Sequence, residues 1–177
     1  MLPFEADKLK TELIPAYENA KDGLPDEVFT YISTVTPLVN VDLLIRNDKG
    51  EILLSWRYDY RRSGWHIPGG IIRYKETFEQ RIAKVARLEI GTDVTYDSDP
   101  IKITEIFVPE RRRGHAISLL YECKPVKDID ITAFNKDKGE TDNGFLKWFD
   151  KCPEVLVYGQ RRAYEGYLKE LLHNSPK

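Results

Sequence analysis

The spacing of hydrophobic residues along this chain changes from a helical to an extended pattern. Residues 4–20 carry apolar side chains at helical spacing. Pro15 interrupts them, because proline has no backbone N–H to donate, so we expect a kinked or broken helix there. Residues 24–33 predict a second short helix, with Pro25 at its start and acidic residues in its first turn.

Extended segments follow these helices. Two runs rich in Val, Leu and Ile, residues 38–45 and 52–56, flank the turn Asn47-Asp48-Lys49-Gly50. Such runs around a glycine-bearing turn are typical of an antiparallel hairpin. Further strands are predicted at residues 101–108, 116–123 and 145–149.

A long amphipathic helix is predicted between the strands. Thr77 and Gln80 form a capping-box pattern at its start, and Gly91 is a typical terminator. A last helix is expected at residues 159–173. Strands around one central helix, with another helix at the end, predict an α/β (α+β) fold in which a mixed sheet lies between helical layers.

Length and charge restrict the class of protein. At 177 residues and 20.6 kDa the chain suits one domain, residues 25–177, preceded by an N-terminal helical extension, residues 1–24. With 27 basic and 29 acidic residues the net charge is -2, so no overall field favours nucleic acid or an anionic membrane. Only two cysteines and no long apolar stretch occur, which predicts a soluble, cytoplasmic protein.

Two carboxylates, Glu79 and Glu89, fall on the apolar side of the long predicted helix, and Glu79 lies in the first turn, where the helix N-terminus stabilises negative charge. At about 100° per residue Glu89 lies between Phe78 and Ile82. A carboxylate that faces a packed surface must be neutralised or find a cation, and the helix dipole disfavours negative charge near the C-terminal end. Two alternatives remain open: Glu89 pairs with a nearby arginine, or it binds a metal ion.

The residues around Glu89 have a characteristic spacing. After Gly70 come five residues, then Glu76, then seven more, then the run KVARLEIG at residues 84–91. This segment resembles the Nudix box of hydrolases that act on a nucleoside diphosphate linked to another group.

Two departures from that box refine the resemblance. Val85 and Leu88 stand where the box has two further metal-side glutamates. The same departures, together with the run TPLVNVDLLIRNDKGEILLSWR at residues 36–57, resemble the GDP-mannose mannosyl hydrolase branch of the family.

The resemblance implies a Nudix α/β/α sandwich and a divalent cation, Mg2+ with Mn2+ as the alternative. It implies that the Glu89 carboxylate and the Gly69 backbone carbonyl ligate the ion, and that Glu76 and Lys84 brace the loop against the helix. In that branch, water attacks the anomeric carbon of a nucleotide sugar with inversion and releases free sugar and nucleoside diphosphate. One carboxylate and one carbonyl suit a single ion that neutralises a diphosphate.

Several cationic residues are candidates for binding the departing diphosphate. Arg57 matches an arginine in the branch's second strand and is expected to act in catalysis and substrate binding. Arg61 and Arg62 follow in a polar loop, where each either contacts phosphate or is only solvated. Asp42 is expected either to orient Arg57 or to point outward from its strand. Arg73 is expected to substitute for an arginine that the branch has directly after the glycine pair.

The general base is harder to assign. The branch uses a histidine five residues before a late tryptophan, beside a metal-ligating glutamine. Counting back from Trp148 gives Asn143 and Asp142. Asparagine cannot take a proton at neutral pH, so Asp142, as base or metal ligand, or its neighbour Glu140 is the candidate. His115 is a further candidate at the phosphate end of the substrate, or else a structural residue.

Two other functions remain open. One is a Nudix pyrophosphatase that cleaves between the phosphorus atoms of a nucleotide sugar or ADP-ribose, and the other is a non-catalytic nucleotide-binding module. Tyr58, Tyr60 and Trp65 either stack on a base or pack in the protein. By resemblance to the branch we also expect a homodimer.

Overall fold

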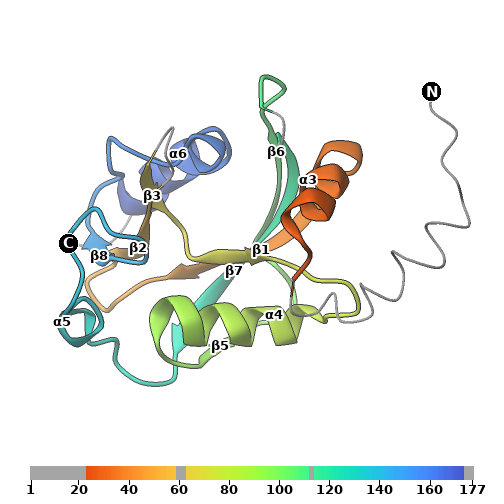
Figure 1. Cartoon of the computed structure of the whole chain (residues 1–177). Coiled ribbons are helices and arrows are strands. Elements are labelled where there is room, and N and C mark those ends of the chain that lie inside the picture. Colours follow the sequence, from red (N-terminus) through yellow and green to blue (C-terminus); the bar gives the residue numbers. More distant parts are fainter. Residues whose placement is uncertain (1–22, 59–62, 112–113, 174–177) are drawn as a thin grey trace, which may run out of the picture.

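Two sheets with helices on both sides form the core of the protein (Figure 1). The computed structural model describes residues 23–58, 63–111 and 114–173. The broken helix predicted for residues 4–20, Arg61 and Arg62 therefore lie outside the described residues. The helices are α3 (Asp26–Val35), α4 (Phe78–Val85) with its π-helical continuation η3 (Ala86–Ile90), α5 (Ile131–Phe134) and α6 (Tyr158–His173). The strands are β1 (Leu38–Ile45), β2 (Ile52–Arg57), β3 (Gly64–His66), β4 (Gly69–Ile71), β5 (Val94–Tyr96), β6 (Lys102–Phe107), β7 (His115–Pro125) and β8 (Leu146–Phe149).

The larger sheet is mixed, as predicted. Its order within the described residues is β4-β1-β7-β5, and β6 also pairs with β7. Strands β1 and β7 run parallel, whereas the other pairs in this sheet are antiparallel. The smaller sheet has the order β3-β2-β8 and is antiparallel. The predicted α+β class with a mixed sheet is confirmed.

The predicted hairpin of β1 and β2 is wrong. A single antiparallel bridge joins Arg46 to Ile52, and the two strands then enter different sheets. The turn itself is well made, because the Asn47 Oδ1 accepts the N–H groups of Lys49 and Glu51 at 3.0 Å. Instead of alternating, β1 is continuously buried from Val41 to Ile45, and β2 begins with four consecutive buried residues. Strands of this kind are covered on both faces, so each becomes the centre of its own sheet.

Two hydrophobic clusters pack on opposite faces of β1. One contains Val41, Leu43 and Ile45 together with residues of α4, whereas Leu44 belongs to the other, which includes residues of α6. Figure 1 shows α4 and α6 on opposite sides of β1 and β7. This arrangement is the layered packing that the sequence predicted.

Helix α4 begins and ends as the sequence predicted, but its last turn differs. The Thr77 side chain accepts the Gln80 N–H and the Gln80 side chain accepts the Thr77 N–H, which completes the capping box. Gly91 is left-handed with φ 82°. Its N–H donates to Ala86 O at 3.0 Å, five residues back, so the final turn is π-helical. A π-turn is a local widening that sequence periodicity does not reveal.

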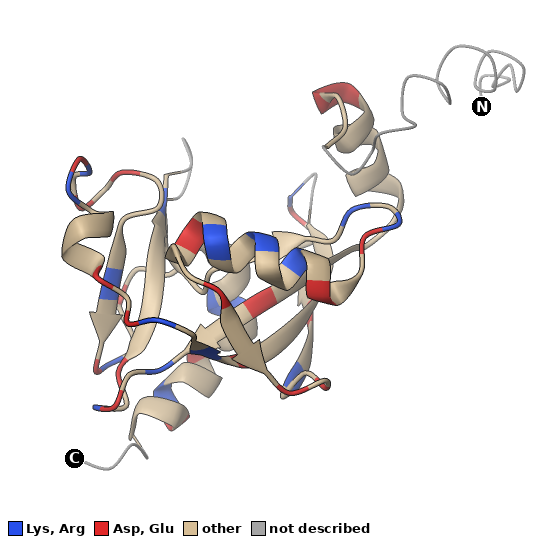
Figure 2. Ribbon diagram, turned by 90° about the horizontal axis from the view of Figure 1, so that it is seen from below, with Lys and Arg blue, Asp and Glu red and all other residues tan. Residues whose placement is uncertain are grey.

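Short elements escaped prediction, whereas the longer ones were found. Strands β3, β4 and β5 and helix α5 span only three or four residues each. Helix α6 and strands β6, β7 and β8 match the predicted segments within two residues at each end. Figure 2, which views the molecule from the α4 side, shows basic and acidic residues interspersed. Within the described ranges no helix has the length and apolarity needed to cross a lipid bilayer.

Candidate functional site

The backbone of Gly69 has one free side, and the pairing of β4 with β1 determines which side this is. Before Gly69, the Leu43 N–H donates to Pro68 O at 2.8 Å. After it, the Ile72 N–H donates to Val39 O at 2.9 Å. Hydrogen-bonded and non-hydrogen-bonded positions alternate along an antiparallel ladder, so Gly69 occupies a non-hydrogen-bonded position. Its N–H and its C=O therefore both point away from β1.

Only glycine fits at position 69. The register places Gly69 opposite Asp42, and a Cβ built on Gly69 would lie 2.0 Å from Asp42 Oδ1 and 2.7 Å from Val41 O. Both contacts are far inside van der Waals distance. This position needs a glycine because the backbone must approach β1 closely.

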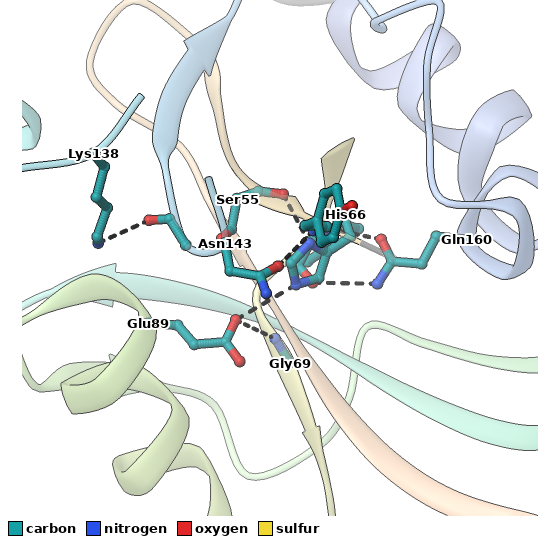
Figure 3. Close-up of polar contacts among 10 residues, drawn as sticks. Ser55, His66, Gly69, Glu89, Lys138, Asn143 and Gln160 are labelled. Carbon is teal, nitrogen blue, oxygen red and sulfur yellow. Dashed lines mark hydrogen bonds and ion pairs between the residues drawn. The ribbon is translucent and has the colours of Figure 1, made fainter. Parts of the chain in front are cut away.

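The η3 turn carries Glu89 toward this free side of Gly69. The Gly69 N–H donates to Glu89 Oε2 at 3.3 Å, and the same oxygen lies 3.6 Å from His66 Nε2 (Figure 3). The Glu89 side chain is 28% exposed. No arginine among the described residues contacts the Glu89 carboxylate. Within these residues, the alternative that Glu89 pairs with a nearby arginine is therefore excluded.

His66 was not identified from the sequence, yet it lies beside Glu89. Its imidazole is 4% exposed, and Nδ1 lies 2.7 Å from Ser55 O, a carbonyl that can only accept. Nδ1 therefore carries the proton of the neutral ring. Burial lowers the pKa of His66 below its ordinary value, which outweighs the opposing effect of Glu89. The neutral tautomer leaves Nε2 as a lone pair directed at Glu89.

The segment that carries His66 is held on both sides. Strand β3 pairs with β2 so that His66 lies opposite Ser55. On α6, Gln160 accepts the Ile67 N–H at 2.6 Å and donates to Ile67 O at 3.2 Å. These contacts fix the backbone on either side of the imidazole, so its position does not depend on a mobile loop.

A cavity of about 470 Å³ opens beside Glu89. Its polar lining includes His66, Arg57, Lys138 and Asn143, so one carboxylate faces two cations. Apolar side chains of Trp56, Leu88 and Phe134 form the rest of the wall. Glu89 and Arg57, two of the candidate site residues from the sequence, thus line the same cavity. A cavity with both signs of charge and an apolar wall can accommodate a phosphorylated ligand that also carries an uncharged group.

Lys138 is a second cation that sequence reasoning missed. Its ammonium donates to Gly144 O at 3.1 Å and lies 3.8 Å from the centre of the Phe134 ring. Burial lowers the pKa of Lys138. Within the polar stretch 135–144 nothing in the sequence distinguishes this lysine from Lys136, and only the fold brings it to the cavity.

The two candidates for the general base occupy different positions. Asn143 lines the cavity, and its Oδ1 accepts the Tyr58 N–H. Asp142 lines an adjoining cavity of about 560 Å³, which also includes Asn143 and Tyr58. One carboxylate oxygen of Asp142 accepts the Gly139 N–H at 2.7 Å. The two cavities thus meet at Asn143, and Glu140 is exposed and lines neither.

Asp42 neither points outward nor lines the cavity. It is 2% exposed and accepts hydrogen bonds from Ser118 Oγ and from Tyr164 Oη (3.1 Å). Burial raises the pKa of Asp42 to about 6, although these hydrogen bonds and the charge of Arg57 act in the opposite direction. Asp42 lies opposite Gly69 in the sheet, so it could influence a bound substrate only through the backbone of Gly69.

Two further predicted substrate contacts lie elsewhere. The Arg73 guanidinium stacks on Phe29 of α3, 5.9 Å from the ring centre. His115 Nε2 lies 3.0 Å from Glu105 Oε1, and the ring packs edge-on against Phe107. His115 lines a separate cavity of about 380 Å³ next to α3. The structure does not bring these two residues into the cavity with Glu89.

Of the aromatic candidates, one lies at the site. Tyr58 lines both cavities and is 51% exposed. Trp65 packs edge-on against Trp56, Phe145 and Phe149 and so belongs to the core of the smaller sheet. Tyr60 lies outside the described residues.

The donor atoms beside Gly69 fit one divalent ion with few protein ligands. The Glu89 carboxylate, the outward carbonyl of Gly69 and the unpartnered Nε2 of His66 are all on this side of the turn. Val85 is buried in the core and Leu88 is apolar, so neither can hold an ion. Among the described residues, no group of three or more His, Cys, Asp or Glu side chains could bind an ion together.

Comparison with known proteins identifies the family. The NUDIX domain matches residues 36–152, and the chain therefore belongs to the Nudix family, as its box predicted. Nudix hydrolases generally use a divalent cation and act on nucleotide-derived substrates. The low-salt glycan biosynthesis protein Agl8 of Haloferax volcanii is 37% identical over 75 residues, which are 42% of this chain. That match spans about half the length of the relative, 48%.

Solved structures agree with the fold. A candidate asymmetric diadenosine tetraphosphate hydrolase from Jonesia denitrificans superposes with a TM-score of 0.60 at 20% identity, covering 81% of this chain and 99% of the other. The MutT protein of Methanosarcina mazei Go1 gives 0.57 at 20% identity, with 81% and 99% covered. A UDP-X diphosphatase gives 0.55 at 17% identity, with 92% and 76% covered. The predicted Nudix fold is confirmed by these likenesses.

Proposed function

We propose that this protein hydrolyses a nucleotide sugar with a divalent cation, by attack of water on the anomeric carbon. The observation that carries the proposal is the single helix carboxylate, Glu89, in a cavity that also contains Arg57 and Lys138. A site with one acidic ligand and two cations is suited to binding a diphosphate as a leaving group. Attack on phosphorus commonly draws on several ions, and no described carboxylate other than Glu89 lines this cavity.

The residues of the site have separate roles in this reaction. Glu89 and the Gly69 carbonyl would hold the ion, Mg2+ or Mn2+, which neutralises the diphosphate when bound. Arg57 and Lys138 donate to phosphate oxygens and stabilise the charge that develops as the diphosphate leaves. The predicted contacts of Arg73, His115 and Asp42 with substrate stay untested, and their positions do not favour them.

The bond changes balance without any further reactant. The water oxygen bonds to the anomeric carbon, the bond from that carbon to the diphosphate oxygen breaks, and the diphosphate keeps the electron pair. The proton released by water passes to a general base. Asp142 is the proposed base, because it is the carboxylate nearest in sequence to Asn143, where the two cavities meet. An Asn143 amide cannot accept this proton, so its role is to orient Tyr58 and the substrate.

One comparison and the shape of the two cavities support the substrate class. The Haloferax relative carries the description of a glycan biosynthesis protein, which is consistent with a sugar-containing nucleotide as substrate. The cavity also has the apolar wall and the adjoining space that a sugar and a base require.

Product analysis in heavy-oxygen water tests the proposal. The protein is incubated with GDP-mannose, UDP-glucose or ADP-ribose and with Mg2+ or Mn2+, and the products are followed by phosphorus NMR and mass spectrometry. From GDP-mannose or UDP-glucose we expect nucleoside diphosphate without heavy oxygen, free sugar labelled at the anomeric oxygen, and loss of turnover in Glu89→Gln. Nucleoside monophosphate with label in phosphate would establish the pyrophosphatase instead. No turnover, combined with nucleotide-dependent thermal stabilisation, would establish the binding module.

The predicted homodimer and the extension 1–24 belong to this proposal too. Residues 1–22 lie outside the described residues. Light scattering on the full chain and on a chain lacking residues 1–24 would show whether a dimer forms and whether the extension contributes to it. If both samples had the molar mass of a single chain, the homodimer prediction would be overturned.

A further inference from the structure

Two electron-pair donors face each other beside Gly69. Ser55 O fixes the proton of His66 on Nδ1, so Nε2 presents a lone pair, and the Glu89 carboxylate can only accept. Nε2 and Glu89 Oε2 are 3.6 Å apart, and the two side chains point toward one another in Figure 3. This is too long for a direct hydrogen bond, and both atoms would lack the hydrogen to make one.

The His66 nitrogen is buried without a partner. Nε2 is inaccessible to solvent and accepts no hydrogen bond from any residue within 23–58, 63–111 and 114–173. A buried acceptor that is left unsatisfied costs on the order of 1–3 kcal/mol. The arrangement is explained if a positively charged species occupies the position between the two donors.

The distance fits two ligands of one ion. Metal bonds to imidazole nitrogen and carboxylate oxygen are each about 2.1 Å, so the two ligand atoms lie about 3.0 Å apart at the 90° of an octahedral site and about 3.4 Å apart at the tetrahedral angle. At the observed 3.6 Å, a small side-chain movement lets both atoms ligate one ion.

The surroundings of His66 are those of a metal ligand. Histidines that ligate metals almost always donate their other ring N–H to a carboxylate or a backbone carbonyl, which orients the ring. Here the Nδ1–H donates to Ser55 O at 2.7 Å. The Gln160 contacts to Ile67 additionally hold the backbone beside the imidazole. The ring is therefore positioned before any ion arrives.

We propose that His66 Nε2 is a metal ligand together with Glu89 and the Gly69 carbonyl, and that this site prefers Mn2+ or another first-row transition ion to Mg2+. The proposal rests on the divalent-cation site of the proposed function and adds a nitrogen to it. Imidazole nitrogen binds transition ions well, whereas Mg2+ prefers oxygen ligands and water. We expect Mn2+ to bind at least about tenfold more tightly than Mg2+.

Pulsed electron paramagnetic resonance on the Mn2+-loaded protein tests this directly. The full chain is prepared with natural-abundance nitrogen and again with 15N-histidine only, and each is loaded with less than one equivalent of Mn2+. We expect nuclear modulation from a coordinated 14N that changes to the 15N pattern in the labelled protein. Mn2+ that binds without any nitrogen modulation overturns the proposal, as does an unchanged 14N pattern after labelling. Absence of Mn2+ binding at millimolar concentration overturns it as well.

Matched variants provide a second measurement. His66→Asn keeps an N–H that can donate to Ser55 O but removes the Nε2 lone pair, and His173→Asn removes an exposed imidazole at the end of α6. We expect His66→Asn to weaken Mn2+ binding by about 10- to 100-fold while Mg2+ binding changes by less than about threefold. His173→Asn should leave both affinities unchanged. Equal Mn2+ affinity in folded His66→Asn and in the wild type would overturn the proposal.

These readouts separate the proposal from the enzymatic function. If nitrogen coordination is seen but no nucleotide sugar is cleaved, the His66 ligand stands and the proposed reaction fails. If a nucleotide sugar is cleaved but Mn2+ shows no coordinated nitrogen, the reaction stands and the His66 ligand fails. Should His66→Asn not fold, the labelling experiment on the wild-type chain still decides.

Discussion

Arg81 and Glu76 form a buried ion pair that joins the start of α4 to the loop before it. Arg81 Nε donates to Glu76 Oε2 at 2.8 Å, and its Nη2 lies 2.7 Å from the same oxygen, with each side chain only 9% exposed. That oxygen also accepts the Arg73 N–H at 2.8 Å. The resemblance implied Lys84 as the partner of Glu76, but Lys84 is exposed and the cation is Arg81. The loop that follows the glycine pair is thus tied to the helix that carries Glu89.

Replacing Arg81 should therefore destabilise the fold much more than replacing Lys84. Arg81→Met would leave Glu76 buried without a cation, which costs on the order of 3–5 kcal/mol. Lys84→Met, on the exposed side of the same helix, should change the free energy of unfolding by less than about 0.5 kcal/mol. Urea unfolding of the two variants measures the difference. If both variants lost a similar free energy of unfolding, the Arg81–Glu76 pair would not be what holds the loop to α4.

Asp42 should make stability depend on pH. Its pKa is raised from 3.8 to about 6 in the folded protein, so the folded state binds this proton more tightly than the unfolded state. The resulting stabilisation is complete below pH 3.8 and is lost as the pH rises through about 6. Since one pKa unit corresponds to about 1.4 kcal/mol, the contribution is on the order of 3 kcal/mol.

Asp42→Asn should remove this dependence. An amide can still accept from Ser118 and Tyr164 but does not titrate, so the variant should lose less stability than the wild type between pH 4 and pH 7. Thermal unfolding in metal-free buffer across this range provides the measurement. The exposed Asp48→Asn should retain the wild-type profile. Parallel profiles for wild type and Asp42→Asn would contradict the assignment.

Arg57 and Lys138 should both contribute to binding of a nucleoside diphosphate. A hydrogen bond to a charged group is worth about 1.5–3 kcal/mol, so each substitution by alanine should weaken binding at least about tenfold. Lys136→Ala is the matched control, because Lys136 is exposed two residues from Lys138 and does not line the cavity. Calorimetric titration with a nucleoside diphosphate and Mn2+ makes the comparison. An equal effect in all three variants would indicate only a general loss of positive charge.

Thr77 should stabilise the start of α4. Its hydroxyl accepts the Gln80 N–H at 3.2 Å, and the Gln80 side chain returns a hydrogen bond to the Thr77 N–H at 3.0 Å. Thr77→Ala should lower the free energy of unfolding by about 1 kcal/mol, whereas Thr77→Ser should cost less than about 0.5 kcal/mol because it retains the acceptor. Chemical unfolding of the two variants checks this, and an equal loss in both would point to packing of the methyl group instead.

The sequence correctly predicted features that depend only on residues close together in the chain. Thr77, Gln80 and Gly91 predicted both ends of α4, because a capping box and a left-handed terminator involve residues only a few positions apart. The hairpin prediction failed for the opposite reason. A continuous hydrophobic run indicates a strand but does not specify its neighbours, and the partners of β1 are β4 and β7 rather than β2.

The site also combines features that short spacings in the sequence predicted with contacts that only the fold creates. The box spacing located Glu89 and Gly69, and the structure brings them into contact at 3.3 Å. A helical projection at a constant angle cannot anticipate the π-turn that aims Glu89, nor the exposure of Phe78, which is 50%. Arg57 was found from its resemblance to a known strand. Lys138 was missed, because it reaches the cavity through the path of the chain between α5 and β8.

By itself, the sequence determined the family, the ends of the central helix, the longer strands and the carboxylate and glycine at the site, because these depend on short spacings within one segment. Only the tertiary structure decided that His66 faces Glu89 and that Arg81 neutralises Glu76. Each of those contacts requires side chains from separate elements to share a buried space. Burial is a property of the packed molecule, so which charges must be paired, and by which partner, follows from the fold.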